Sequence, residues 1–450
     1  MPRGCNNEEQ GKRPKTKSKA KGKTQKPKGK AAGSTNMLSI EPRFRHSIRR
    51  AIGRSRALLP LAFCALPFAI ALSLAVLLNA QTPEQTPYAA IDRDAVNYHG
   101  PGREDSHDLG GKEIPIGLLL PLTGARQAEG EALRRAAQMA VDEENAAASA
   151  GSSRLQLVAR DESGPWGQAS AQVVHLVFDD RAVAIITSTE GGSAHLAEQV
   201  GNKVGVPILT LSSDSTITEI DLPWIFRIGP ADTAQAQLFA RDIYQNRKLE
   251  RVLLLTQDDH DGRLGAQEFI KAARTLSFVA PAQIVVDAAS LGGDAILEKM
   301  RAAQALVVWT DAATAQRIAE QMRQLHVIAP LYCSRKAAAS ETGGASRSNG
   351  SAAGHADANK WIAQSPAAGK TADEFRRRYR ERFGSEPGIG PAEAYDAVRI
   401  LAASLRKSGP NRARLRDVLD DFHAYAGASG AISFDHAGND TAPITLVHLD

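Results

Sequence analysis

The sequence has few of the residues that build disulfide frameworks or aromatic binding surfaces. Its 450 residues include 3 cysteines, and aromatic residues make up 5% of the chain. Cys5, Cys64 and Cys333 lie in three stretches of different composition, so we expect no disulfide framework. A chain of this length can bury a sufficient core without one. The cysteines therefore leave the cellular compartment open.

Motifs of known catalytic chemistry are also missing from the sequence. It contains no Gly-x-Ser-x-Gly elbow, no phosphate-binding loop and no His-Glu-x-x-His motif, and its histidines are scattered. We therefore expect no enzyme, no cofactor and no bound metal ion.

The charge is divided unevenly along the chain. Residues 1–56 carry 17 Lys and Arg against 3 Asp and Glu, whereas the remainder carries 38 against 47. Residues 12–30 alternate lysine with Gly, Pro, Thr and Gln, which predicts a disordered basic tail over 1–56. Such a tail is either a contact for nucleic acid or anionic lipid, or a solvated flank that sets membrane topology. No aromatic residue interleaves these lysines, so we favour the flank and expect no nucleic acid.

One long apolar run follows the tail. Residues 57–83 carry no charge, and 58–78 are almost continuously apolar. This run is long enough to cross a membrane, which needs about 20 apolar residues. Six arginines precede the run and no positive charge follows it in 81–87, which places the tail in the cytoplasm. We expect an uncleaved transmembrane signal-anchor helix over 57–80, because the apolar run exceeds that of a cleaved secretory signal. Cleavage is the alternative.

Residues 81–112 are rich in Pro, Gly and charge, and we interpret them as an extracytoplasmic tether. After them, short apolar runs alternate with segments of helical periodicity. Strands are predicted at 114–120, 155–159, 182–186, 207–211, 251–256, 283–286, 305–309 and 330–332. Helices are predicted at 130–147, 167–178, 193–203, 262–276 and 313–325. This alternation predicts an α/β fold with right-handed βαβ units and parallel sheets.

The last part of the chain has a different pattern. Residues 337–356 are mostly Ala, Ser and Gly, which indicates a flexible insertion. Helices are predicted after it at 372–383, 391–405 and 411–422. A final hairpin is predicted from 430–435 and 445–448.

Six motifs occur in an order that is found in a known family. They are the Pro-Leu-Thr-Gly turn at 121–124, Val-Gly-Val-Pro-Ile-Leu at 204–209, Trp-Ile-Phe-Arg-Ile-Gly-Pro-Ala-Asp at 224–232, Glu-Pro at 386–387, Ala-Tyr-Asp-Ala-Val at 394–398, and Gly-Ala-Ile-Ser-Phe-Asp at 430–435. In this order the chain resembles the type I periplasmic binding proteins, particularly the Leu/Ile/Val-binding branch.

The resemblance covers residues 113–450 and implies two Rossmann-like lobes joined by a three-strand hinge. Lobe 1 would comprise about 113–233 and 361–426, and lobe 2 about 234–345 and 427–450. Hinge closure of two lobes around a ligand is a known type of transition.

The resemblance also implies ligand contacts in the first lobe. In the family the ligand's α-carboxylate sits at a helix N-terminus, where backbone N–H groups are unsatisfied, and the matching residues are Gly192 and Ser193. Ser193 is either a plain N-cap or a ligand contact. Ser212, Ser213 and Asp214 match a second contact turn, and they either bind polar ligand groups or form local turns.

Three further candidates lie in the second lobe. The turn at 257–262 is a rim loop, a polar ligand contact or, least favoured, a metal site, because no second histidine cluster accompanies it. In that turn Asp261 replaces a tyrosine of the family, and Thr310 follows a predicted strand. Arg335 stands where the family has an acidic residue for the ligand's ammonium. An arginine would instead hold a carboxylate or phosphate, so an acidic or amine-free solute, or a lost ligand site, is favoured.

These patterns predict a single-pass protein of the bacterial cytoplasmic membrane. Its extracytoplasmic domain would capture a small polar ligand, amino-acid-like or an organic acid, for an ABC transporter. The alternative is a non-transport interaction module on the same fold, for example an activator of cell-wall synthesis. Fold alone does not choose between the two.

Overall fold

The computed structural model describes residues 113–149, 152–165, 167–219, 222–287, 289–338, 359–366 and 369–449. The predicted tail, anchor helix and tether lie outside these ranges, and so does nearly all of the predicted insertion. Across the described ranges, no helix has both the length and the apolar composition that crossing a bilayer requires.

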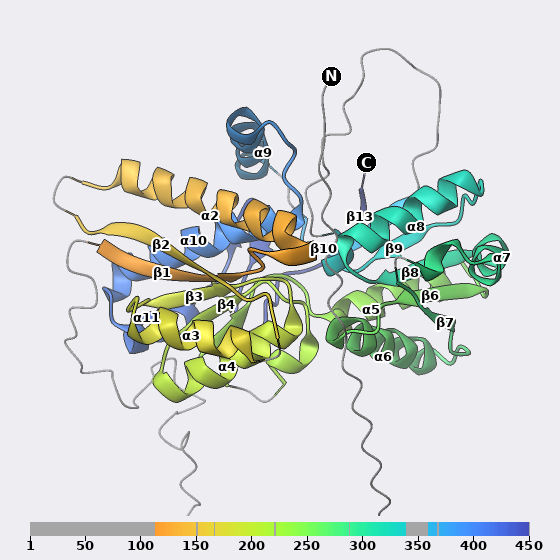
Figure 1. The fold of residues 1–450 in the computed structure, drawn as a ribbon, viewed down its shortest axis with the longest axis horizontal. Helices are drawn as coiled ribbons and strands as arrows, with labels where there is room; N and C mark the ends of the chain where they lie inside the picture. Colours follow the sequence, from red (N-terminus) through yellow and green to blue (C-terminus); the bar gives the residue numbers. More distant parts are fainter. Residues whose placement is uncertain are drawn as a thin grey trace, which may run out of the picture. The chain divides into compact units, whose positions relative to one another are not determined.

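The first sheet has five parallel strands in the order β2-β1-β3-β4-β5. Their bounds are β1 Glu113–Leu120, β2 Arg154–Asp161, β3 Ala184–Thr187, β4 Ile208–Thr210 and β5 Ile225–Arg227. Helices α2 (Gln127–Ala147) and α10 (Ile389–Ser408) pack together on one face, whereas α3 (Gln168–Phe178) and α4 (Gly191–Val204) cover the other (Figure 1). Because both faces are covered, the central strands are continuously apolar.

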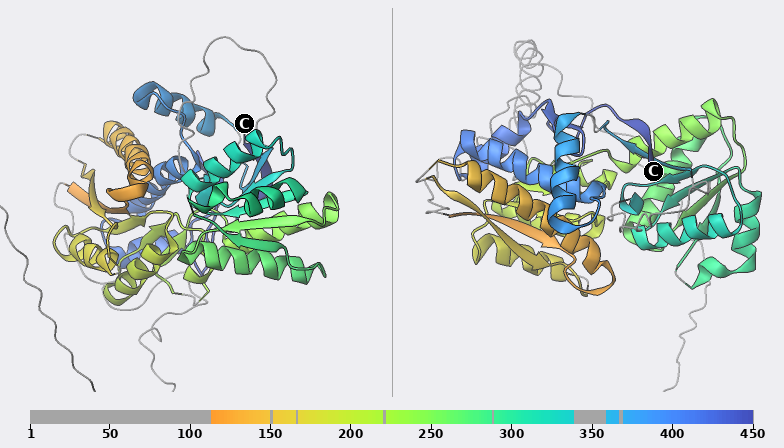
Figure 2. Two further views of the ribbon diagram at one scale, coloured as in Figure 1. Left: turned by 45° about the vertical axis from the view of Figure 1, so that its right-hand side comes forward. Right: turned by 90° about the horizontal axis from the view of Figure 1, so that it is seen from above.

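Two more helices complete this first lobe: α9 (Lys370–Phe383) and α11 (Arg412–Asp420). Both contribute to the same core as α2, through Phe375 and Leu415 among others. The views in Figure 2 show these late, blue segments beside the orange segments that open the domain. The first lobe is therefore built from two distant parts of the chain.

The second sheet has six strands in the order β13-β10-β9-β8-β6-β7. Their bounds are β6 Val252–Thr256, β7 Ala282–Val285, β8 Ala305–Trp309, β9 Leu331–Cys333, β10 Lys360–Gln364 and β13 Thr445–Leu449. All neighbours pair in parallel except β13, which runs antiparallel to β10. Helices α5 (Asp232–Ala240) and α6 (His260–Thr275) cover one face, and α7 (Asp294–Ala302) and α8 (Ala312–Gln324) the other. The expected α/β fold with two parallel-stranded lobes is confirmed.

Helices α5 and α7 of the second lobe were not predicted. A π-helical turn (Arg241–Asn246) extends α5, and α7 forms a separate helix before β8. In α5 the buried residues include the polar Asp232 and Gln235 beside Ala236 and Phe239, so no apolar stripe marks the helix in the sequence. Because polar residues are part of its buried face, α5 lacks the apolar periodicity by which a helix is predicted.

The predicted C-terminal hairpin is wrong. Strand β12 (Ala431–Ile432) pairs with β11 (Tyr425–Ala426), whereas β13 joins the second sheet beside β10. The loop between them is fixed by Asp435 and Asp440, whose carboxylates accept backbone hydrogen bonds within it, and the chain crosses between lobes there. Because β10 also belongs to the second sheet, the chain returns to the first lobe after Gln364 and not at about residue 361.

The first and third crossings between lobes are tied together. Gly229 N donates to Asp440 Oδ2 at 3.0 Å, and Arg227 N donates to the carbonyl oxygen of Gly438 at 2.8 Å. Gly229 has a φ of +86°, and a Cβ atom there would lie 2.4 Å from Cζ of Arg335. Glycine is therefore required at this point of the hinge.

Candidate functional site

Polar side chains of both lobes meet at the carboxyl ends of the strands. We call this set the interlobe site. From the first lobe it takes residues that follow β1, β3 and β4, and from the second lobe residues that follow β6 and β9. Its charged members are Arg126, Glu190, His195, Asp214, Asp259, His260, Asp261 and Lys336. Ligands of open α/β sheets bind at this edge.

The N-terminus of α4 holds a carboxylate of the protein itself. Gly191 N donates to Asp261 of the second lobe, at 3.1 Å to Oδ1 and 3.3 Å to Oδ2. A Cβ atom on Gly191 would lie 2.3 Å from Asp261 Oδ1, so only glycine allows this approach. The unsatisfied N–H groups and the dipole of a helix N-terminus favour an anion. Asp261 thus occupies the position that the sequence predicted for a ligand carboxylate.

Lys336 joins this carboxylate to others. Its Nζ lies 2.6 Å from Asp261 Oδ2, 3.0 Å from Glu190 Oε2 and 3.2 Å from Asp259 Oδ2, and the side chain is 6% exposed. Burial disfavours the charged form, but Asp261, Glu190 and Asp259 outweigh it and raise the pKa of Lys336. The ammonium is therefore retained. Since Glu190 belongs to the first lobe, this ion pair also crosses between lobes.

Arg126 extends the charge network within the first lobe. Its guanidinium donates to both carboxylate oxygens of Glu129, to Glu190 Oε2 at 2.8 Å and to Glu162 Oε1 at 3.4 Å. Burial raises the pKa of Glu162 to about 8, although Arg126 and the hydroxyl of Ser188 oppose this. Glu190 therefore sits between the cation of one lobe and the cation of the other.

A second cross-lobe contact is centred on Asp214. Its Oδ2 lies 2.7 Å from Nε2 of His260, in α6, and 3.1 Å from Nε2 of His195, in α4. Its Oδ1 accepts from the backbone N (2.9 Å) and the hydroxyl (2.7 Å) of Thr216. Burial alone would raise the pKa of Asp214, but the bonds from His195, His260 and Thr216 lower it far below its usual range. Hydrogen bonds to Asp214 and Glu198 raise the pKa of His195 to about 9.

Gly192, Ser193, Ser212 and Ser213 are the other first-lobe residues predicted as ligand contacts. Helix α4 begins at Gly191 with Glu190 as N-cap, so the N-cap interpretation of Ser193 is wrong and Ser193 is the third helical residue. Gly192 precedes it, and the nearest atom to a Cβ added there would be Glu190 Oε1, at 4.0 Å. Ser212 is buried, and its hydroxyl accepts from Asp214 N at 3.2 Å. The carbonyl oxygen of Ser213 accepts from Asp232 N at 2.7 Å. Their roles as ligand contacts stay predictions.

The three predicted second-lobe residues lie in different places. Asp261 lies in the interlobe site, as described, whereas Thr310 is buried at the end of β8 and donates to the carbonyl oxygen of Asp311 at 2.9 Å. Arg335 lies against the hinge, where its guanidinium pairs with Glu393 of α10 and its backbone N donates to Gln235 Oε1 at 3.0 Å. Burial lowers the pKa of Arg335 to about 10. The carboxylate that Arg335 holds in this structure is one of the protein's own.

Four residues of the site were missed from the sequence. Lys336 differs from the predicted Arg335 by one position beside an insertion, where register is hard to fix. Arg126 follows the turn at the carboxyl end of the first strand, and that position is the signal that marks it as a candidate contact. Glu190 directly precedes α4, where a carboxylate would repel an anionic ligand, so its residue type argues against it as a contact. His195 has no local signal, because its partner His260 is far away in the sequence.

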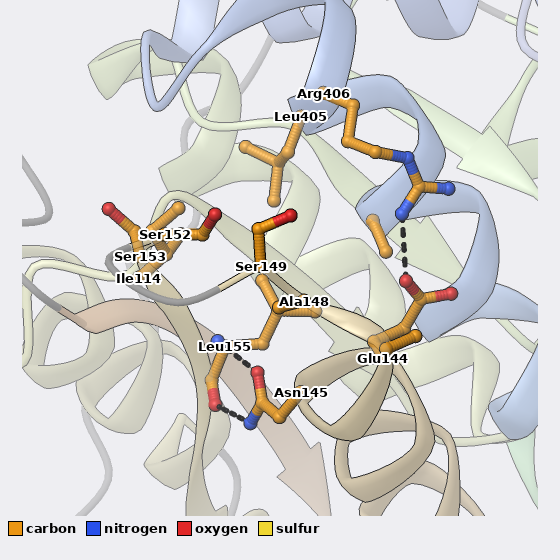
Figure 3. Close-up of a pocket in the computed structure, with 12 residues that line it drawn as sticks. Ile114, Glu144, Asn145, Ala148, Ser149, Ser152, Ser153, Leu155, Leu405 and Arg406 are labelled. Atoms are coloured by element: carbon orange, nitrogen blue, oxygen red, sulfur yellow. Dashed lines mark hydrogen bonds and ion pairs between the residues drawn. The ribbon is translucent and has the colours of Figure 1, made fainter.

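A surface pocket lies elsewhere, between the end of α2 and the end of α10 (Figure 3). It includes Ile114 and Leu155, at the amino ends of β1 and β2. In this pocket Asn145 Nδ2 donates to the carbonyl oxygen of Leu155, and Asn145 Oδ1 accepts from Leu155 N, both at 2.8 Å. Glu144 in the same pocket pairs with Arg406 at 2.7 Å. Because these polar groups serve the fold, and strands present ligands at the opposite edge, the interlobe site is the better candidate.

Comparisons with known proteins agree with this fold. The sequence profile of the family described as "Periplasmic binding protein" matches residues 113–449. An "Amino acid binding protein" of Pseudomonas aeruginosa is 27% identical over 202 residues, which is 44% of this chain and 53% of that protein. The "Leu/Ile/Val-binding protein BraC3" of Rhizobium johnstonii is 26% identical over 180 residues, 40% of this chain and 48% of that protein. The chain thus spans about half the length of the curated relatives it matches.

Solved structures share the fold at lower identity. The branched-chain amino acid transporter substrate-binding protein LivJ from Streptococcus pneumoniae, in complex with isoleucine, has a TM-score of 0.62 at 21% identity, covering 75% of this chain and 97% of that one. A solute-binding protein of an ABC transporter from R. palustris, in complex with benzoate, has a TM-score of 0.64 at 17% identity, covering 75% and 93%.

Proposed function

Because the chain belongs to the periplasmic binding protein family, we propose that it is an extracytoplasmic solute-binding protein. Its ligand is a small polar molecule with a carboxylate, either amino-acid-like or an organic acid. The observation that carries this proposal is the meeting of Gly191 N–H, from the N-terminus of α4, with the ammonium of Lys336 around one carboxylate.

The carboxylate of Asp261 indicates the chemistry of the ligand. A solute that displaces it gains the same two partners, a helix N-terminus and a buried ammonium. Glu190 and Asp259 lie beside that position and would hold the ammonium of an amino acid. Relatives named for amino acid binding, and fold neighbours solved with isoleucine and benzoate, support this ligand class.

Solute binding is tested by thermal unfolding of the full chain, purified in mild detergent, against leucine, isoleucine, glutamate, succinate and benzoate. A solute at 100 times its dissociation constant stabilises a folded protein by about 2.7 kcal/mol, and the midpoint temperature rises accordingly. We expect Lys336→Met to abolish this rise. Lys299→Met, which removes an exposed lysine of α7, should preserve it. A rise that survives Lys336→Met would place the solute elsewhere.

A second candidate is a non-transport interaction module, for example an activator of cell-wall synthesis. The specific observation in its favour is that the protein's own Asp261 and Lys336 already neutralise each other in the interlobe site. Asp261→Asn separates the two candidates, because it removes the competing charge while an amide can still accept from Gly191 N. If no solute tested raises the unfolding midpoint of either the wild type or Asp261→Asn, the interaction module is favoured.

We also propose that residues 57–80 anchor the chain in the bacterial cytoplasmic membrane, with the tail inside and an ABC transporter permease as partner. The charge asymmetry around the apolar run supports this orientation. Protease treatment of spheroplasts tests it. The domain over 113–449 should be accessible from outside while the basic tail is protected, and the reverse pattern would contradict the proposal.

A further inference from the structure

The histidines of the interlobe site are not used by the proposed solute chemistry. His195 lies in the first turns of α4, Asp214 follows β4 and His260 begins α6. One potential ligand atom from each, two imidazole nitrogens and a carboxylate oxygen, lies within 4.8 Å of the others. The sequence disfavoured a metal near His260 because no second histidine accompanied it, and folding supplies that histidine from the other lobe.

We propose that His195, Asp214 and His260 bind a divalent transition-metal ion, with zinc as the reference ion, that joins the two lobes. Two imidazoles and one carboxylate are the protein ligands of many zinc sites that keep one further position open. The inference does not depend on which solute the protein takes.

The donor atoms already converge on one point. Asp214 Oδ2 lies 2.7 Å from His260 Nε2 and 3.1 Å from His195 Nε2, and the two rings meet edge to face at 82°. Around tetrahedral zinc, with bonds of about 2.0–2.1 Å, neighbouring ligand atoms are separated by about 3.3 Å. Binding would therefore lengthen the two distances from Asp214 Oδ2 by about 0.2 and 0.6 Å, and the two imidazole nitrogens would settle from within 4.8 Å to about 3.3 Å of each other. The ion would replace the protons that now link both imidazoles to Asp214, and these protons would go to solvent.

The groups behind the ligands have the arrangement of metal-site supports. His195 Nδ1 lies 3.0 Å from Oε2 of Glu198, whose side chain is 3% exposed. A carboxylate in this place fixes the ring and directs Nε2 toward the metal, as in carboxylate–histidine–zinc triads. Thr216 engages Asp214 Oδ1 and leaves Oδ2 for the ion. The hydroxyl of Thr216 also lies 2.9 Å from His195 Nε2, a contact that the metal would replace.

The ion would act on the relation between the lobes. His195 and Asp214 belong to the first lobe and His260 to the second. An ion that takes ligands from both therefore favours the closed arrangement, and opening must break a metal–nitrogen bond. The fourth coordination position would remain for water or for an acidic group of a ligand.

The test uses the full chain, purified without a polyhistidine tag and stripped with a chelator. Zinc is titrated by calorimetry and cobalt by visible absorption. We expect one ion per chain and a cobalt spectrum of a four-coordinate nitrogen and oxygen site. His260→Gln, His195→Gln and Asp214→Asn should each weaken zinc binding at least about tenfold. His175→Gln is the matched control, since His175 also contacts a carboxylate, Asp179, but lies on the surface of α3.

Circular dichroism and the metal-free unfolding midpoint of each variant show whether it is folded, so that a lost fold is not read as a lost site. Unchanged zinc affinity in His260→Gln overturns the bridge between lobes. Absence of binding by the folded wild type, or thiolate charge-transfer bands in the cobalt spectrum, overturns the site itself.

Discussion

Replacing Gly191 by alanine tests whether Asp261 of the second lobe rests on α4 of the first. The added Cβ atom would lie 2.3 Å from Asp261 Oδ1 and 2.9 Å from Asp214 Oδ2, well inside van der Waals contact. Asp261 must then withdraw, and its hydrogen bond from Gly191 N, 3.1 Å long, is lost. A hydrogen bond to a charged group contributes about 1.5–3 kcal/mol. The clash adds to that loss unless the side chain relaxes fully.

Gly192→Ala is the matched control, one position further along the same helical turn. The nearest atom to its added Cβ is Glu190 Oε1, at 4.0 Å. Alanine inside a helix is favoured over glycine by about 0.5–1 kcal/mol, and both variants receive this gain. The difference between them therefore isolates the cross-lobe contact.

The free energy of unfolding is measured by urea titration of the full chain, followed by circular dichroism. We expect Gly192→Ala to be at least as stable as the wild type and Gly191→Ala to be about 2–3 kcal/mol less stable than Gly192→Ala. Equal midpoints and equal slopes for the two variants would refute the reasoning. In that case Asp261 does not contact α4, and the lobes are apart at this point.

Three further substitutions address the charges and the hinge. Lys336→Met leaves Asp261 without its buried cation and should cost about 3 kcal/mol of unfolding free energy, whereas the double variant with Asp261→Asn should recover most of it; additive losses would contradict the pairing. Because the pKa of Glu162 is raised to about 8, the folded state retains a proton between about pH 4.5 and 8 that the unfolded chain releases, so this group's contribution falls as pH rises. Urea unfolding near pH 4.5 and near pH 8 should show that Glu162→Gln gains stability relative to the wild type as pH rises. A stability difference that does not change with pH would contradict the raised pKa of Glu162. In Gly229→Ala the added Cβ is strained by a φ of +86° and clashes with the guanidinium of Arg335. We therefore expect the unfolding free energy to fall by more than about 1 kcal/mol, and an unchanged urea midpoint would contradict the hinge geometry.

Local periodicity predicted most of the sheets because each strand is a short apolar run between helices. The pairing of β10 with β13 could not be predicted in this way, since Ile362 and Val447 meet only after the chain has crossed between lobes twice. The same limit applies to α5, whose buried Asp232 and Gln235 carry hydrogen-bonding roles that hide its inner face. Sequence patterns record burial within one element and not the partner that buries it.

The interlobe site shows the same limit more sharply. The sequence predicts a rim loop or a polar ligand contact at 257–262 and an anion contact at Arg335. The partners of these residues come from other elements: Gly191 for Asp261, and Glu393 for Arg335. A shift of one residue at β9 decides which cation faces the site, and here it is Lys336. Register at that precision depends on the packing of the whole second sheet.

The internal charge pairs have a consequence for affinity. A solute carboxylate that replaces Asp261 exchanges one hydrogen-bonded ion pair for another of the same kind, so this exchange alone is close to neutral. Net affinity must then come from what Asp261 cannot supply, namely contact of the rest of the solute with both lobes. A solute that also offers an ammonium to Glu190 and Asp259 keeps these carboxylates paired when Lys336 turns toward the new anion. We therefore expect the proposed solute to carry both charges or a large apolar body, and simple inorganic anions to bind weakly.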